Sequence, residues 1–574
     1  MWLRDHPDEV AVIVLGAIVL AAWFLLGLGL HPLFITTLAV SASLLRVGVM
    51  MIVSVGLSLI IGVGAARSRA VELVVLPIVD VLEAVPVISF FPVVLLTFVY
   101  TLGAGAGTEL AADFLILTAL IWNIILGVYE SVRQVPAELI ESTKVLQMNS
   151  LDRFVRLYAP GSFPSIASNL LPSFASALFY LSESEIIAIG AKNYTVFGIG
   201  SLAERYIQTP GDTTLFVGAV LVLLFGITVV VKFVLEPMVD YSEKFKYELV
   251  GGSGVSTPWF SRLTSRLSTA ARPAQLGRLR VMGRPFNAFS YIANQERRAI
   301  GSRRRFGQIV SGRLLRALVA ALISGFLVFV LLSVYSSGAL KQTFSLYTAS
   351  FLFSLLRGTA WDGLRILSAY GISLLISLPL AYLMVTHRLL QRILYPVLEN
   401  VASFPVPLIY PLILSASIFL LGRDRIVGGV WYELDVLLVT VLSAIWYILF
   451  NFHGALKRIP SDILEASDIY GLQGLTKWRY VILPGTAMSL ITGSMEAIGS
   501  FWAGLMIADY FKFSAGTILE VRYGLMKILD VATYSANITE AGAVTLFMIF
   551  LISIITFTVW YPLLTILGRR YRFD

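Results

Sequence analysis

The sequence predicts an all-α polytopic membrane protein made of two parallel six-helix repeats. Three observations lead to this fold class. The chain of 574 residues is 57% apolar and only 14% charged, whereas soluble domains carry about 25% charged residues. Its apolar runs reach about 20 residues, the length that a transmembrane helix needs, and they do not alternate as barrel strands do. Finally, distinctive residues of the first half recur at fixed distances in the second half.

Each half contains six apolar runs that are long enough to cross a membrane. In the first half these cover residues 10–30, 44–65, 78–101, 112–129, 167–190 and 214–236. In the second half they cover residues 314–335, 363–385, 397–421, 435–452, 486–508 and 542–566. We therefore expect about twelve transmembrane helices. No small-residue cleavage site follows the first run, so we expect a retained span rather than a signal peptide.

A polar segment separates the halves, and it predicts the domain boundaries and the topology. We place a first membrane domain at 1–240, a linker at 241–312 and a second membrane domain at 313–574. Thirteen arginines and one acid, Glu296, lie between Arg262 and Arg316. Basic residues collect on the cytoplasmic side of membrane proteins, so we expect the linker and both termini inside. A solvated linker is the simpler interpretation, and docking to anionic lipid or to a partner is the alternative. The net charge of +8 has the same topological explanation, so no nucleic-acid partner is expected.

Two offsets relate the repeats. Residues 319 apart match in and around the second and third spans: Arg46 with Arg365, Pro77 with Pro396, Pro86 with Pro405, and Pro92 with Pro411. Residues 324 apart match farther along: Trp122 with Trp446, Pro136 with Pro460, Glu141 with Glu465, and Pro160 with Pro484. The difference predicts a five-residue insertion between the third and fourth spans. Six spans per repeat give both copies the same orientation, with a pathway on the axis between them. Prolines break a helix where neighbours can satisfy its backbone, so we interpret Pro86, Pro92, Pro405 and Pro411 as gating prolines.

Two polar segments lie between the fourth and fifth spans, at 136–161 and 460–485. The second contains EASDIYGLQGLTKWRYVILP, from Glu465 to Pro484. The first contains ESTKVLQMNSLDRFVRLYAP, from Glu141 to Pro160. Ser461 can cap a helix, Gly471 frees the chain to turn, and a second short helix can follow. These features alone leave two interpretations open, a protein-binding knob or an amphipathic loop on the lipid headgroups.

The second segment resembles the EAA loop of binding-protein-dependent ABC importer permeases. Glu465, Ala466, Gly471 and Pro484 match that pattern, and Ser467 replaces its second alanine. The first segment matches at Glu141 and Pro160 but has Gln147 where the pattern has glycine. The resemblance covers both six-span halves and implies two fused permease domains with a type I ABC importer-like fold. It makes 136–161 and 460–485 the ATPase-coupling loops. Because the first loop lacks the glycine and both alanines, we expect damage to the second loop to cost more.

A subfamily resemblance concerns the acids of the fifth spans. The second span and the proline-spaced third span are similar to those of the nitrate/sulfonate/taurine-type permeases. In that group a fifth-span acid is followed by a Gly-x-Gly turn. Glu185 and Asp509 occupy equivalent positions here, and Gly198-Ile-Gly200 follows the first of them.

An acid at the bilayer centre costs about 2.5–3.5 kcal/mol, so such residues normally face a cavity or a partner. We therefore consider the acids Glu185, Glu496 and Asp509 as pathway lining. Trp502, on the same span as Glu496, is a fourth candidate. The alternative is that Glu185 and Asp509 lie at the external interface, where the cost is small. A row of acids fits a neutral or zwitterionic substrate better than an anionic one. Arg46 and Arg365 are expected to anchor their helices at the interface rather than to bind substrate.

The resemblance implies a transport subunit rather than an enzyme, in the plasma or inner membrane. Its partners would be two ABC ATPase subunits, which carry ATP and Mg, and an extracytoplasmic substrate-binding protein. The glycine run GAGAGTEL lacks the lysine of a P-loop, so we expect no catalytic, cofactor or metal site on this chain. A secondary transporter with parallel repeats is the alternative, which the repeated polar knob disfavours. A membrane scaffold without transport is the third interpretation.

Overall fold

The computed structural model describes residues 7–84, 91–189, 192–209, 212–245, 345–426, 429–513, 517–535, 537–560, 562, 563 and 566. The elements of the first half are α2 (Pro7–Leu25), α3 (Leu30–Arg67), α4 (Arg69–Ala84), α5 (Phe91–Leu102), α6 (Ala104–Arg133), α7 (Ala137–Val145), α8 (Ser150–Arg153), α9 (Ala159–Glu185), β1 (Ile186–Ile189), β2 (Lys192–Thr195), α10 (Ile199–Gln208), α11 (Thr213–Val230) and α12 (Glu236–Ser242). Those of the second half are α17 (Ala349–Thr386), α18 (Arg388–Ala402), α19 (Val406–Leu421), α20 (Arg423–Ile426), α21 (Val430–Arg458), α22 (Ser461–Ile469), α23 (Gly474–Lys477), α24 (Leu483–Ala508), β3 (Tyr510–Phe513), β4 (Thr517–Glu520), α25 (Leu525–Tyr534) and α26 (Ile538–Ile555).

The internal repeat is visible element by element. Helix α17 begins and ends 319 residues after α3. Helices α22 and α23 begin and end 324 residues after α7 and α8. The predicted insertion lies where the offset changes, and the four-residue helix α20 stands there in the second half.

The all-α polytopic class is confirmed. Within the described ranges, seven helices are long and apolar enough to cross a membrane, or up to eight if the bent pair α18–α19 counts as one span. The predicted span at 314–335 lies outside the described residues. The predicted span at 44–65 is longer in the structure, because its helix α3 begins at Leu30.

The third span of the second repeat is sharply broken. Helices α18 and α19 meet at an angle of 96°. Pro405 is the residue just before α19, and Pro411 lies inside that helix. Proline lacks the N–H that would continue the helical ladder, which explains a break at this point. In the first repeat Pro92 is the second residue of α5, whereas Pro86 lies outside the described residues.

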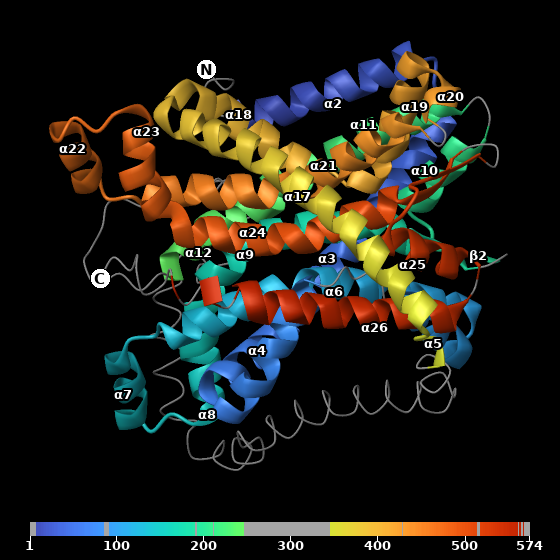
Figure 1. Cartoon of the computed structure of the whole chain (residues 1–574). Helices are drawn as coiled ribbons and strands as arrows, with labels where there is room; N and C mark the ends of the chain where they lie inside the picture. Colours follow the sequence, from blue (N-terminus) through green and yellow to red (C-terminus); the bar gives the residue numbers. More distant parts are fainter. Residues whose placement is uncertain are drawn as a thin grey trace, which may run out of the picture.

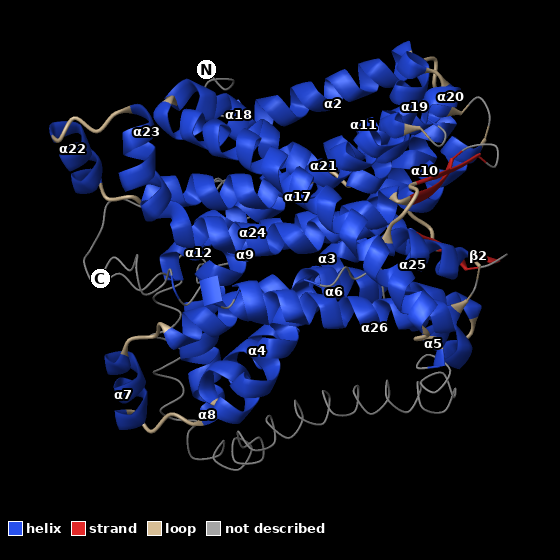
Figure 2. Ribbon diagram, in the orientation of Figure 1, coloured by secondary structure: helices blue, strands red, loops and turns tan. Residues whose placement is uncertain are grey.

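Two short β-hairpins follow the fifth spans, which the sequence did not predict. Helix α9 ends at Glu185 rather than at residue 190, and β1 pairs with β2 in antiparallel register, Ile186 opposite Thr195. Strands β3 and β4 pair in the same way after α24. Figure 2 shows the strands at the end of the molecule opposite α7 and α22.

Each repeat has its own apolar core, and the two repeats interlock. Trp23, Phe174 and Leu223 lie in the core of the first half, and Tyr432 and Phe501 in that of the second. Phe404 and Leu408, from the break and α19, pack into the core of the first half. These contacts join the second repeat to the core of the first.

Candidate functional site

The two polar segments protrude from the same end of the molecule. Helices α7 and α22 stand away from the helical body, each followed by a second short helix, α8 or α23 (Figure 1). The segments therefore form helix–turn–helix projections, as their sequences predict. A five-residue π-helical turn, at Phe154–Tyr158 and Trp478–Ile482, leads each projection into α9 or α24.

The same turn ends α7 and α22. In α22 the Gly471 N–H donates to the Asp468 carbonyl at 3.0 Å, and the Leu472 N–H donates to the Ser467 carbonyl at 2.9 Å. This pair of bonds is the Schellman motif, which needs a left-handed residue after the helix. Gly471 supplies it with φ +68°. Gln147 stands at the equivalent place in the first segment and adopts φ +50°, so the turn survives the loss of the glycine.

The projections present charged and apolar side chains to solvent. Glu141 and Glu465 are exposed, and the Lys477 ammonium pairs with Asp468 at 2.6 Å within the second projection. Ile469 and its equivalent Val145 are 83% and 82% exposed. Ala466, Pro160 and Pro484 are half-buried.

A cavity of about 260 Å³ lies between the repeats. Helices α4, α6 and α9 line it from the first repeat, and α18, α19, α21 and α24 from the second. The Ser176 and Tyr447 hydroxyls, one from each repeat, share a hydrogen bond of 2.8 Å at its wall. The cavity thus stands where the sequence predicts a pathway.

The predicted lining residues separate into two groups. Glu496 lines the cavity, where one carboxylate oxygen accepts a hydrogen bond from the Asn451 amide at 2.8 Å. Glu185, Trp502 and Asp509 are not among the residues that surround this cavity. Trp502 packs in the core of the second half. Glu185 and Asp509 are wholly buried, each beside an arginine.

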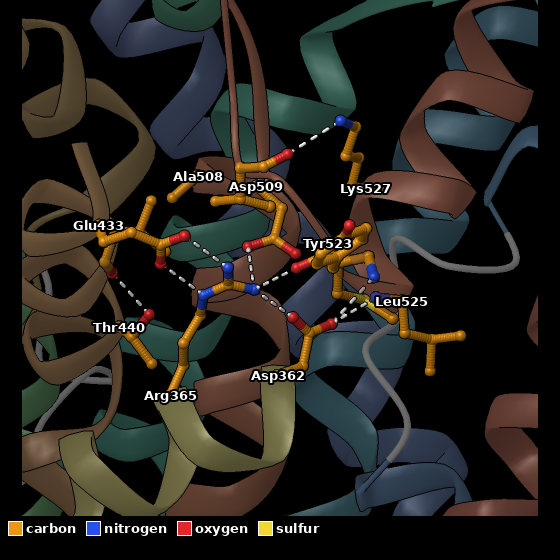
Figure 3. Close-up of polar contacts among 12 residues, drawn as sticks. Asp362, Arg365, Glu433, Thr440, Ala508, Asp509, Tyr523, Leu525 and Lys527 are labelled. Carbon is orange, nitrogen blue, oxygen red and sulfur yellow. Dashed lines mark hydrogen bonds and ion pairs between the residues drawn. The ribbon is translucent and has the colours of Figure 1, made fainter. Parts of the chain in front are cut away.

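In the second repeat Arg365 is the centre of a buried polar cluster (Figure 3). Its Nε and Nη2 donate to the two oxygens of Glu433, both at 2.8 Å. Its Nη1 donates to Asp362 at 2.7 Å and to the Tyr523 carbonyl at 2.8 Å. Asp509 lies 3.8 Å from the same Nη1. One guanidinium therefore serves three carboxylates, of which Asp362 and Asp509 are 0% exposed.

The first repeat builds the equivalent cluster around Arg46. Its Nη1 donates to Glu185 at 2.7 Å and its Nη2 donates to Glu109 at 3.2 Å. Ser43, which occupies the position of Asp362, donates from its hydroxyl to Glu185. These contacts join α3, α6 and the end of α9. Arg46 and Arg365 thus bind carboxylates of the protein.

Both clusters also hold the start of a short helix. In the first repeat the Gly200 N–H donates to Glu185 at 2.7 Å, and the Ile199 N–H donates to the Ser43 hydroxyl at 2.9 Å. In the second repeat Asp362 accepts from the N–H groups of Leu525 at 2.7 Å and Met526 at 3.1 Å. The first N–H groups of a helix have no partner within it and favour negative charge. Side chains of distant helices therefore cap α10 and α25.

Glycine is required where the chain passes each cluster. A Cβ on Gly198 would lie 2.0 Å from a Glu185 oxygen, and one on Gly524 would lie 2.1 Å from an Asp509 oxygen. Both distances are far below contact, so only glycine lets the backbone approach. This explains Gly198 in the Gly-x-Gly turn after Glu185.

Sequence reasoning missed most of the cluster, although its signal was present. Ser43 and Asp362 stand at the offset of 319, and Glu109 and Glu433 stand at the offset of 324. Applying the offsets to every polar residue would have found both pairs. Within the described residues no group of His, Cys, Asp and Glu is arranged to hold a metal ion.

Three relatives indicate the kind of protein that this chain resembles. The nitrate import permease protein NrtB of Leptolyngbya laminosa is 27% identical over 173 residues, 29% of this chain and 58% of that protein. The bicarbonate transport system permease protein CmpB of Synechocystis is 25% identical over 173 residues, 30% of this chain and 58% of that protein. A permease protein of Escherichia coli strain K12 named for aliphatic sulfonates transport is 27% identical over 89 residues, 15% of this chain and 34% of that protein. The matches thus span less than two thirds of each relative.

A family match covers most of both repeats. Residues 54–235 and, separately, residues 373–573 match the binding-protein-dependent transport system inner membrane component. The two matches fall on equivalent elements and leave out the linker. The chain therefore belongs to the family of binding-protein-dependent transport system inner membrane components, as an ABC transporter permease that carries the family's region twice.

Proposed function

We propose that this chain is the complete membrane pathway of an ATP-driven ABC importer, in which the projections at 136–161 and 460–485 bind two ATPase subunits. Closure of the ATPase pair on ATP and Mg would move the projections, and α9 and α24 would transmit that motion to the cavity. The cavity would then open to one side of the membrane and to the other in turn, which is alternating access. ATP hydrolysis would occur on the partner subunits. A substrate-binding protein would dock at the opposite end, on the hairpins and on α10 and α25.

The observation that carries this proposal is the apolar surface of the two projections. Val145 and Leu146 on the first, and Ile469, Tyr470 and Leu475 on the second, are between 70% and 89% exposed. The projections themselves stand away from the helical body (Figure 1). Exposed apolar side chains grouped on a projection are typical of a protein-binding surface.

The break between α18 and α19 supports a moving pathway. It lies directly at the cavity, which Ser403, Phe404 and Val406 help to line. Hinges of moving proteins are a few residues at the ends of elements that absorb changes in φ and ψ, and the break between α18 and α19 offers such residues. In this proposal the gating prolines supply that joint, the projections face the cytoplasm with both termini, and the chain resides in the plasma or inner membrane.

The test uses the matched pair Ile469→Asp and Val145→Asp in the reconstituted transporter. Each substitution adds a charge to an exposed position, so the thermal unfolding midpoint should stay within a degree or two of wild type. Substrate-stimulated ATPase activity should fall at least tenfold for Ile469→Asp, and less for Val145→Asp, because the second loop keeps more of the pattern than the first. Full activity of Ile469→Asp would refute coupling through this surface. Uptake driven by an ion gradient without any ATPase subunit would favour a secondary transporter instead.

A further inference from the structure

The charged side chains that line the cavity between the repeats are all acidic among the described residues. Three carboxylates line it, Glu83 from α4, Glu399 from α18 and Glu496 from α24. Among the described residues that line it, none is lysine, arginine or histidine. The Asn451 amide that bonds Glu496 is neutral, so it orients that carboxylate without balancing its charge.

One cation interacts with Glu399 from outside the cavity, and it has a second acidic partner. Lys232, on the π-helical turn after α11, acts on Glu399 from outside the cavity wall. Its ammonium pairs with Glu236, one helical turn farther along. The described residues of the cavity wall thus include acids from both repeats and no basic side chain.

Aromatic side chains make up much of the remaining wall. Trp122 and Trp446, equivalent residues of the two repeats, both line the cavity, together with Phe179, Tyr447 and Phe450. Aromatic faces attract cations, by about 0.5–2 kcal/mol for each contact.

We propose that this cavity selects a small organic cation, an amine or quaternary ammonium compound. Its positive group would face Glu399 and Glu496, and its apolar part would lie against Trp122 and Trp446. An anion about 5 Å from one such carboxylate would be repelled by about 3 kcal/mol at an effective dielectric constant of about 20. Two relatives are named for nitrate and bicarbonate transport. Those anions would need basic or neutral donor groups, whereas this cavity presents acids. This inference rests on the proposed function only in treating the cavity as part of the transport pathway.

The experiment measures binding to the purified full chain in detergent, without ATPase subunits. The probes are the chlorides of ethanolamine, tetramethylammonium and tyramine, against sodium nitrate and sodium bicarbonate at equal ionic strength. At least one cation should raise the thermal unfolding midpoint saturably and give a binding isotherm by calorimetry, whereas the two anions should not. Glu496→Gln should weaken that binding at least tenfold. Asp240→Asn, which changes an exposed acid on α12 outside the cavity, should leave it unchanged.

Three results would overturn the proposal: binding of nitrate or bicarbonate in preference to the cations, no binding of any of the three cations, or unchanged binding in Glu496→Gln. ATP-driven uptake of nitrate by the reconstituted transporter would refute the cation and leave the importer standing. Cation binding without any coupling to an ATPase would support the cation and refute the importer.

Discussion

Arg365 offers the sharpest test of how this membrane fold is held together. We consider Arg365→Gln, which removes the charge and keeps a polar side chain of similar length. The loss of the Glu433 pair is the smaller part of the cost, because Glu433 is about one-third exposed and water can solvate its carboxylate when the arginine is gone. The cost comes from Asp362 and Asp509, which are 0% exposed and lose their only cation among the described residues.

The magnitude follows from two independent arguments. Breaking a buried ion pair by removing one partner costs about 3–5 kcal/mol. Alternatively, the protein can take up a proton, and holding an ordinary carboxyl protonated at pH 7 costs about 4 kcal/mol, three pKa units at about 1.4 kcal/mol each. Arg365→Gln should therefore destabilise the chain by about 4 kcal/mol at pH 7. That deficit should shrink by about 1.4 kcal/mol per unit as the pH falls, since protonation becomes easier.

The assay is unfolding of the detergent-purified chain, followed by tryptophan fluorescence, with Arg357→Gln as the matched control. Arg357 lies on the same helix but is exposed, and its guanidinium stacks 4.0 Å from the ring centroid of Tyr523. Losing that contact should cost about 1 kcal/mol at most. The double variant Arg365→Gln/Asp509→Asn should be more stable than Arg365→Gln, because one unpaired carboxylate is gone. Equal unfolding midpoints for Arg365→Gln and Arg357→Gln would refute the reasoning.

The remaining predictions concern backbone fit and pH. Gly198→Ala should lower the unfolding midpoint by several degrees because its Cβ would collide with Glu185, whereas Gly371→Ala, with nothing within 4 Å of its Cβ, should be neutral or slightly stabilising. Gln147→Gly should stabilise the first projection by about 1 kcal/mol by relieving the left-handed φ, detected as slower amide exchange in α7; faster exchange would contradict this. Burial, with Glu183 and Asp362 nearby, holds the pKa of the Asp530 carboxyl well above its usual range, so the folded state binds this proton more tightly. Stability should then fall as the pH rises above about 4, and Asp530→Asn should flatten that dependence; an unchanged slope would contradict it.

The repeat and its projections could be predicted from the sequence because their signals are local. Long apolar runs mark helices wherever they occur, and Pro460 and Gly471 mark a short helix and its turn without reference to distant residues. The offsets of 319 and 324 then carried these predictions from one half to the other. The fold class, the insertion and the paired projections follow from such signals.

What could not be predicted depends on packing between distant segments. The hairpins consist of four-residue strands, and Ile186–Ile189 (IIAI) continues the apolar run of α9, so hydropathy alone extends the helix through it. Glu185 resembles a pathway acid in sequence, and only the approach of Arg46 from α3 makes it part of a cluster. Glutamine rarely adopts a positive φ, so Gln147 disfavours the turn in sequence, yet the residue has the left-handed conformation in the projection.

Both clusters cap the start of a short helix, but they use different side chains to do so. This difference leads to a rescue prediction. In the first repeat the Ser43 hydroxyl on α3 and the longer acid Glu185 at the end of α9 share the capping of α10. In the second repeat the acid after α24 is the shorter Asp509, and Asp362 on α17 accepts both N–H groups of α25 instead. Asp362→Ser alone should therefore destabilise, because the Met526 N–H loses its partner Asp362 and the Asp509 side chain is one methylene shorter than that of Glu185. Asp362→Ser/Asp509→Glu should recover most of the loss by recreating the first repeat's arrangement, and a double variant no more stable than the single one would show that the repeats are not interchangeable at this site.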